Sequence, residues 1–287
     1  MEIGSREHRD LLCRFFIDTF TPYEPTKLEW PELDQACLDR LRALPVWDEA
    51  VKTEAETAMK VIELGKAEKD PLMAEAISLQ GYEEQRHADI LKIMVGRYGL
   101  DARRPPDLTP PADPNWAFMR VGYGECFDSF FAFGLFALAR ESGFFPPSLV
   151  KLFEPVMQEE GRHIIFHVNW VAYNQAQLSF ARRPSYIFRR GLAMWLQAAG
   201  RVKTAMQLGG AAASKKDEPA DQDNFTMKAH ESFGDFSFRE FLNLCLRENE
   251  RRLEPYDKRL LRPTLVPSLA RTMLAVTPAP AASAAAN

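Results

Sequence analysis

The motif EEQRH at residues 83–87 is repeated as EEGRH at residues 159–163, and this repeat decides the fold. Each copy follows a proline, Pro71 or Pro147, and one offset of 76 residues superimposes the prolines, the glutamate pairs and the Arg-His pairs. Both copies lie deep in long helical patterns. We interpret the repeat as an internal duplication of a helix.

The inner glutamate and the histidine of each motif are spaced to act together. Glu84 and His87, like Glu160 and His163, are three residues apart, which places them on one helix face about one turn from each other. Each pair lies on an apolar stripe. The other residues of the two stripes are Met73, Ile77, Gln80, Leu91 and Val95, and Leu149, Phe153, Val156 and Trp170. Burying such carboxylates without compensation is costly, so each pair indicates a bound metal ion.

A Glu-x-x-His pair on each of two helices, with one further glutamate from each of two others, builds a carboxylate-bridged di-iron or di-manganese centre in a four-helix bundle. In these motifs the sequence resembles the ferritin-like di-iron carboxylate superfamily, which includes rubrerythrins, the ribonucleotide reductase small subunit, soluble acyl desaturases and bacterial multicomponent monooxygenases. The resemblance covers residues 47–175. It implies an all-α fold, with His87 and His163 as terminal metal ligands.

Hairpin geometry predicts where the other carboxylate ligands lie. In an antiparallel helix pair, a residue after the turn faces one at about the same distance before it. Around a turn at residues 69–70, the partner of Glu84 is expected near residue 55, where Glu54 and Glu56 compete. Glu54 is the better candidate because its helical neighbours are apolar, whereas Glu56 shares a side with Lys60.

The second hairpin leaves a similar choice. Around a turn near residue 144, the partner of Glu160 is expected near residue 128, so Glu125 and Asp128 compete. The resemblance favours Glu125, because family members have a comparable spacing. It also makes Ser129, four residues after Glu125, a candidate catalytic residue, since bacterial hydrocarbon monooxygenases carry a hydroxyl residue beside their metals at this position. Leu91 stands where a reductase small subunit would carry its radical tyrosine, which argues against a radical-generating role.

Three further residues accompany the two motifs. His167 lies one turn beyond His163 on the same face, either as a hydrogen-bond donor to a ligand or as a third histidine ligand. The resemblance includes arylamine N-oxygenases, which have an extra histidine ligand at a different spacing. Arg86 and Arg162 point off the ligand face and are expected either to orient a ligand carboxylate through a salt bridge or to form a surface pair.

Composition limits the possible partners. The chain has 287 residues, a formal net charge of −4 and 46% hydrophobic residues, and no basic tract is interleaved with aromatics, so no nucleic acid partner is expected. Residues 1–30 lack a signal-peptide layout, and no apolar run reaches the roughly 18 residues of a membrane span. We expect a cytoplasmic protein. Four scattered cysteines without a Cys-x-x-Cys pair argue against a disulfide framework or zinc site.

The chain is expected to divide into four parts. Residues 1–46 form a helical extension with His8 on its surface, and residues 47–175 form the bundle. Residues 176–275 form C-terminal helices with a flexible linker at 209–224, and residues 276–287 form a disordered tail.

The predicted long helices are separated by proline-rich or polar connections, chiefly a crossover at residues 100–115. Their expected ranges are 45–68, 71 onward, 116–141, 148–174, 186–208 and 225–253. In the fifth, a stripe that includes Phe188, Trp195 and Leu196 is expected to pack on the bundle rather than bind a membrane.

The expected activity follows from the ligand types and the resemblance. Carboxylate oxygens with imidazoles suit two iron ions, with manganese possible. We expect a non-haem di-iron oxygenase or oxidase that uses dioxygen and an external electron donor to oxidise a small organic substrate, in a possible homodimer. The phenylalanine-rich helix at 116–141 could line its pocket. The alternatives are a rubrerythrin- or ferritin-like protein that handles peroxide or iron, and a metal-free helical interaction module.

Overall fold

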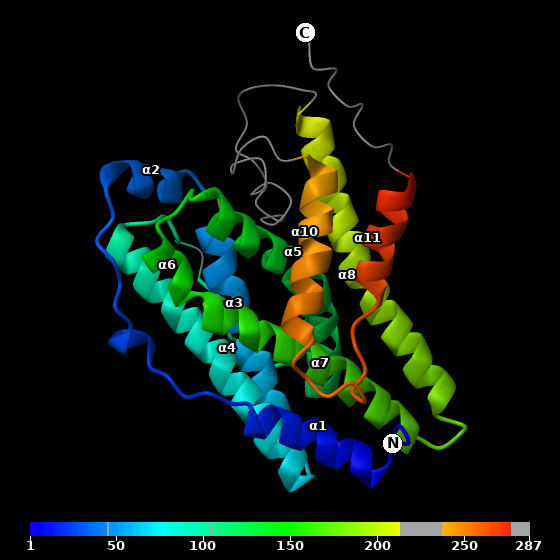
Figure 1. Cartoon of the computed structure of the whole chain (residues 1–287). Helices are drawn as coiled ribbons and strands as arrows, with labels where there is room; N and C mark the ends of the chain where they lie inside the picture. Colours follow the sequence, from blue (N-terminus) through cyan, green and yellow to red (C-terminus); the bar gives the residue numbers. More distant parts are fainter. Residues whose placement is uncertain (45, 104, 213–236, 277–287) are drawn as a thin grey trace.

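The computed structural model describes residues 1–44, 46–103, 105–212 and 237–276, with only the backbone for 202–212, and within these ranges it contains helices and no strand (Figure 1). The elements are α1 (Arg6–Asp18), η1 (Pro25–Lys27), α2 (Gln35–Ala43), α3 (Trp47–Ala67), α4 (Pro71–Tyr98), α5 (Pro114–Ser142), α6 (Pro147–Leu152), α7 (Glu154–Gln177), α8 (Arg183–Ala212), α10 (Phe238–Leu253) and α11 (Leu265–Val276).

Four long helices pack around one another and position the repeated motifs. Helix α3 contacts α4 and α5, and α7 contacts the same two helices. Helix α4 begins where Asp70 accepts hydrogen bonds from two backbone N–H groups and Pro71 occupies the first turn, where its missing N–H costs nothing. It ends at Gly99, whose φ of 59° favours glycine. The helices predicted at 45–68, from Pro71 and at 116–141 correspond to α3, α4 and α5.

The helix predicted at residues 148–174 is interrupted. It consists of α6 and α7, which are separated at Phe153. Pro155 explains the break, because its ring nitrogen cannot donate the backbone hydrogen bond that a continuous helix requires and its ring disfavours the preceding turn. The second motif lies in α7, beyond the interruption.

The N-terminal extension packs on the bundle through α1. Its residues Leu12, Cys13 and Phe16 belong to the main hydrophobic core. The expectation that His8 lies on the surface is wrong, because the side chain is fully buried and its Nε2 lies 3.1 Å from Oδ1 of Asn169 on α7. The amphipathic face of α1 includes His8, so docking of α1 buries the ring.

Helix α8 contacts α5 and α7, but not through the predicted stripe. Phe188 and Trp195 are 70% and 63% exposed, whereas Ala193 is fully buried. The small Ala193 side chain lets the helix approach the bundle closely, and Arg201 anchors it to Asp128 of α5. Residues 209–212 of the predicted linker extend α8. Residues 213–236 and 277–287, which include most of the linker, the start of the helix predicted at 225–253 and almost all of the tail, lie outside the described residues.

Helix α5 is long and apolar enough to cross a membrane by length and composition, in contrast to the expectation that no stretch of the chain is. However, 67% of its most apolar window is buried inside the protein. This is the environment of a core helix, and α5 supplies residues such as Phe118 and Phe133 to the main core.

Candidate metal centre

Six acidic and histidine side chains from four helices converge inside the bundle. They form two groups, in each of which the candidate ligand atoms lie within 4.8 Å of one another. The groups are Glu54, Glu84, His87 and Glu160, and Glu84, Glu125 and His163. Glu84 belongs to both groups. The arrangement therefore could hold metal ions at two neighbouring positions that share one carboxylate.

Both imidazoles face the carboxylates through Nδ1. His87 Nδ1 lies 3.2 Å from Oε1 of Glu160 and 3.5 Å from Oε2 of Glu54. His163 Nδ1 lies 2.9 Å from Oε1 of Glu84. These contacts are close, but neither Nδ1 has a hydrogen-bond partner of acceptable geometry among the described residues. The same is true of both Glu125 oxygens. Buried polar atoms normally have partners, so these atoms are the ones that bound cations would satisfy.

The outer glutamate of each motif contacts the histidine of the other motif. Glu159 Oε2 on α7 lies 2.8 Å from Nε2 of His87 on α4, and Glu83 Oε2 on α4 lies 3.0 Å from Nε2 of His163 on α7. Such carboxylate contacts fix the ring orientation and leave the opposite nitrogen available for a metal. The duplicated sequence thus produces a reciprocal arrangement, in which each helix orients the other's histidine.

The arginine of each motif contacts the outer glutamate of the other motif. Arg86 donates to Glu159 at 2.5 Å, and Arg162 donates to Glu83. Both arginines are buried, with 2% and 4% of their surface exposed. Of the two alternatives left by the sequence, the surface pair is therefore wrong, and each arginine instead neutralises a buried glutamate that contacts a histidine. The repetition of Arg beside His in both motifs was the sequence signal for this role.

The N-terminal segment contributes contacts that sequence reasoning missed. Arg86 donates to the backbone oxygen of Thr21 at 3.1 Å and stacks 3.8 Å from the ring centroid of Tyr23. Arg162 donates to the backbone oxygen of Thr19. The Tyr23 hydroxyl also lies 3.4 Å from Oε2 of Glu159. No motif marks this segment, because two of its four contacts come from backbone carbonyls.

Electrostatics at the centre oppose its full ionisation without cations. Burial raises the pKa of Glu54 to about 7. Burial also raises the pKa of Glu125 well above its ordinary value, and the negative charge of Glu84 reinforces the shift. For His87 and His163, burial acts to lower the pKa, but the surrounding carboxylates outweigh it and raise the pKa well above 6.5. The carboxylates thus attract positive charge, which here can be protons or metal ions.

The donor set fits a pair of divalent cations. Four carboxylates, from Glu54, Glu84, Glu125 and Glu160, would carry four negative charges, which two divalent ions balance while the imidazoles stay neutral. The outer glutamates are already balanced by the arginines. Carboxylate and imidazole donors without thiolates suit iron or manganese. The buried atoms without partners and the charge balance therefore both fit a two-metal centre.

For each pair of competing candidate ligands, the structure places one residue in the cluster and the other in an ion pair outside it. Glu54 lies in the first group, whereas Glu56 forms an ion pair with Lys60 at 3.3 Å. Glu125 lies in the second group, whereas Asp128 accepts from Arg201 on α8. The apolar surroundings of Glu54 were a usable signal in the sequence.

The last two candidates lie beside the centre. Ser129 is buried and donates to Oε2 of Glu160 at 3.1 Å. His167 is fully buried but belongs to neither group. Its ring packs edge-on against Tyr123, with centroids 4.8 Å apart, and fills the space where Gly122 has no side chain. Burial and the charge of Arg190 lower the pKa of His167 to about 3, so the ring is neutral.

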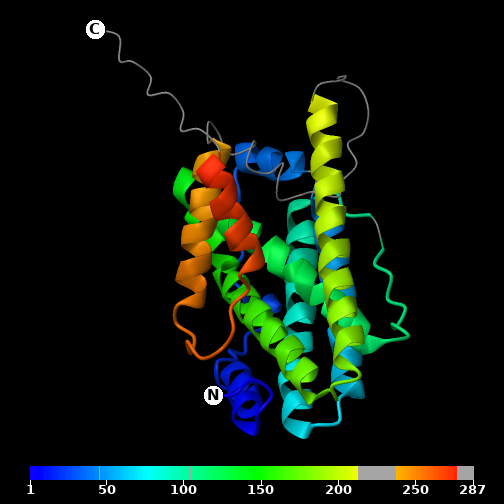
Figure 2. The ribbon, with the colours of Figure 1, turned by 90° about the vertical axis from the view of Figure 1, so that its right-hand side faces the viewer.

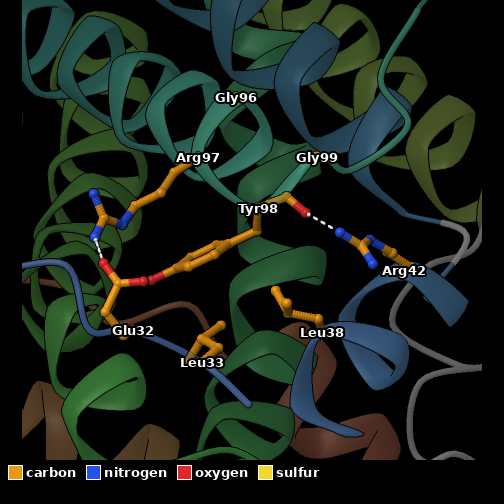
Figure 3. Close-up of a pocket in the computed structure, with 8 residues that line it drawn as sticks. All are labelled: Glu32, Leu33, Leu38, Arg42, Gly96, Arg97, Tyr98 and Gly99. Atoms are coloured by element: carbon orange, nitrogen blue, oxygen red, sulfur yellow. Dashed lines mark hydrogen bonds and ion pairs between the residues drawn. The ribbon is translucent and has the colours of Figure 1, made fainter. Parts of the chain in front are cut away.

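A surface pocket of about 510 Å³ lies elsewhere, at the C-terminal end of α4 (Figure 3). Its two arginines are engaged, because Arg97 pairs with Glu32 at 2.5 Å and Arg42 donates to the backbone oxygen of Tyr98 at 3.1 Å. None of the six clustered side chains lines it.

Comparisons with protein-family models, with curated proteins and with solved structures found no match. The inference of function therefore depends on the geometry of this centre.

Proposed function

We propose that residues 47–175 form a ferritin-like four-helix bundle whose core binds two iron ions. The observation that carries this proposal is that Glu84 belongs to both groups of candidate ligands. Glu54, His87 and Glu160 would hold one ion, and Glu125 and His163 the other, with Glu84 between them. The reciprocal contacts of Glu83 and Glu159 support it, since they present Nδ1 of both histidines to the same space.

We further propose that the protein is a non-haem di-iron oxygenase or oxidase for a small organic substrate. Two ferrous ions, when bound, supply electrons to dioxygen, and an external donor returns them. Within this chain, Ser129 holds one oxygen of Glu160, and Arg86 and Arg162 hold the outer glutamates in place. Two phenylalanines of α5, Phe133 and Phe130, are buried in the main core and in a second hydrophobic cluster, respectively.

One observation favours the alternative of peroxide or iron handling. The His167 ring fills the space beside Gly122, which lies three residues before Glu125 on α5, so this space is closed to an organic substrate. Small inorganic reactants need less room. The two functions share the metal centre and differ in whether an organic compound is oxidised.

The metal centre and the reaction are tested in sequence. Elemental analysis after anaerobic iron loading should give about two ions per chain, as in di-iron bundles, for wild type and for Glu75→Ala, which changes an exposed residue of α4. Folded Glu84→Ala should lose most of its metal. Iron-loaded protein should then consume oxygen and reductant faster when an organic substrate is added. A wild-type metal content near zero would select the interaction module, and rapid peroxide consumption without organic oxidation would select the alternative enzyme.

A further inference from the structure

Within the described part of the chain, helix α8 presents an apolar face to solvent. Phe188 and Trp195, which lie two turns apart, are 70% and 63% exposed. Ile187 and Leu196 extend this surface, and Phe180, just before the helix, is 90% exposed. Exposed aromatic and aliphatic side chains grouped along one helix mark an interaction surface, unlike single scattered ones.

Helix α11 carries a second exposed stripe. It consists of Leu265, Leu269, Met273 and Val276, which are spaced by three or four residues and are 41% to 75% exposed. Both helices lie on the same side of the molecule, the side that faces the viewer in Figure 2. Both also pack on α5, because Ala198 of α8 and Leu274 of α11 join one hydrophobic cluster. We call these two stripes, with Phe180, the α8/α11 face.

The charge around this face is positive, although the chain has a net charge of −4. Residues 178–212 contain six basic and no acidic residues, and residues 258–276 contain four basic and no acidic residues. Four of these charges are balanced by ion pairs, in which Arg189 contacts Asp113, Arg201 contacts Asp128, Arg259 contacts Asp257 and Arg271 contacts Glu250. Arg183, however, donates to backbone oxygens, and Arg190 donates to the neutral groups of Tyr123 and Gln175.

We propose that the α8/α11 face binds the surface of an anionic phospholipid bilayer. Amphipathic helices with Trp, Phe and Leu on one face and Arg or Lys beside it lie in the membrane interface, and each basic residue near an anionic surface strengthens binding. A second copy of the chain is a poorer occupant, because it would bring two arginine-rich faces together and like charges repel. The proposal reverses the expectation that these apolar residues pack in the bundle, and it does not depend on the metal centre.

Co-sedimentation of the full chain with vesicles tests this assignment. We expect binding to vesicles that contain phosphatidylglycerol and much weaker binding to phosphatidylcholine alone. The variant Phe188→Ser/Trp195→Ser should bind anionic vesicles at least about tenfold more weakly, because two apolar side chains no longer enter the interface. The matched control is Tyr82→Ser, which removes an aromatic side chain that is 50% exposed on α4. Both variants change exposed residues, and circular dichroism checks that they fold.

A second variant tests how much the arginine charges contribute to vesicle binding, separately from the apolar side chains. Arg182→Gln/Arg183→Gln should weaken binding to anionic vesicles by about fivefold per charge and leave binding to phosphatidylcholine unchanged. Absence of wild-type protein from the anionic pellet overturns the proposal. So does equal binding by Phe188→Ser/Trp195→Ser. A wild-type dimer in light scattering that Trp195→Ser converts to a monomer, without vesicle binding, would assign the face to a second copy instead.

Discussion

Glu83 on α4 lies 3.0 Å from Nε2 of His163 on α7, so the outer glutamate of the first motif orients the histidine of the second. Glu159 and His87 repeat this relationship in the opposite direction at 2.8 Å. Neither motif orients its own histidine. The two copies therefore form one unit, and a change in either helix affects the ligands on the other.

The first prediction concerns metal affinity. Glu83→Gln should weaken iron or manganese binding by about 10- to 100-fold, the usual effect of removing a hydrogen-bonded partner of a ligand histidine. A competition titration with a chromogenic chelator measures the dissociation constant. Glu75→Gln, which changes an exposed residue of the same helix, should bind like wild type. Equal affinities for Glu83→Gln and wild type would show that Glu83 has no part in the centre.

The second prediction concerns the buried pair of Glu83 and Arg162. Glu83→Gln leaves the Arg162 charge buried with only a neutral partner, which should lower the free energy of unfolding by about 3–5 kcal/mol. Adding Arg162→Met removes that charge and should recover part of the loss. Urea unfolding of the metal-free proteins measures both values. Additive losses in the double variant would contradict direct coupling.

The sequence predicted most of the helical architecture because its signals are local and repeated. The proline before each motif, the three-residue spacing of Glu84 and His87, and the apolar neighbours of Glu54 each report on one helix face. The interruption at Phe153 could also have been read from Pro155. These features depend on backbone geometry and on periodicity, both of which a single sequence displays.

Other features depend on contacts between distant segments, and the sequence does not show them. The binding of Arg162 to the backbone oxygen of Thr19 requires the N-terminal segment to dock on α7. The burial of His8 has the same origin. For α8, the sequence shows an apolar stripe beside basic residues, but which face meets the bundle depends on the small Ala193 and on Asp128 of another helix.

The third prediction concerns the repulsion among the clustered carboxylates. Glu125→Gln should bind substantially less metal, because the second group loses one of its two carboxylates and keeps only Glu84. The metal-free variant should nevertheless be at least as stable as metal-free wild type at neutral pH, because burial and the charge of Glu84 already raise the pKa of Glu125 well above its ordinary value. Thermal unfolding in chelator compares the two proteins. A clearly lower melting temperature for the variant would contradict this account.

The fourth prediction concerns His167, for which the sequence left two roles. Its ring belongs to neither ligand group, and neither nitrogen has a hydrogen-bond partner among the described residues. His167→Phe should therefore keep the wild-type metal content and increase stability by about 1 kcal/mol, since an unpaired buried polar group is removed. Elemental analysis and urea unfolding measure the two effects. Loss of metal in the folded variant would identify His167 as a ligand.

The last prediction separates the two enzyme classes through Ser129, whose hydroxyl donates to Oε2 of Glu160 at 3.1 Å. Ser129→Ala should retain its metal but lower substrate-dependent oxygen consumption by about 10- to 100-fold, because a hydrogen bond to a charged group contributes about 1.5–3 kcal/mol. Ser78→Ala, at an exposed position of α4, is the matched control and should match wild type. An oxygen electrode with aromatic and lipid-like compounds gives the rates. If all three proteins leave every compound unchanged while consuming peroxide at one rate, the centre handles peroxide, and the oxygenase assignment fails.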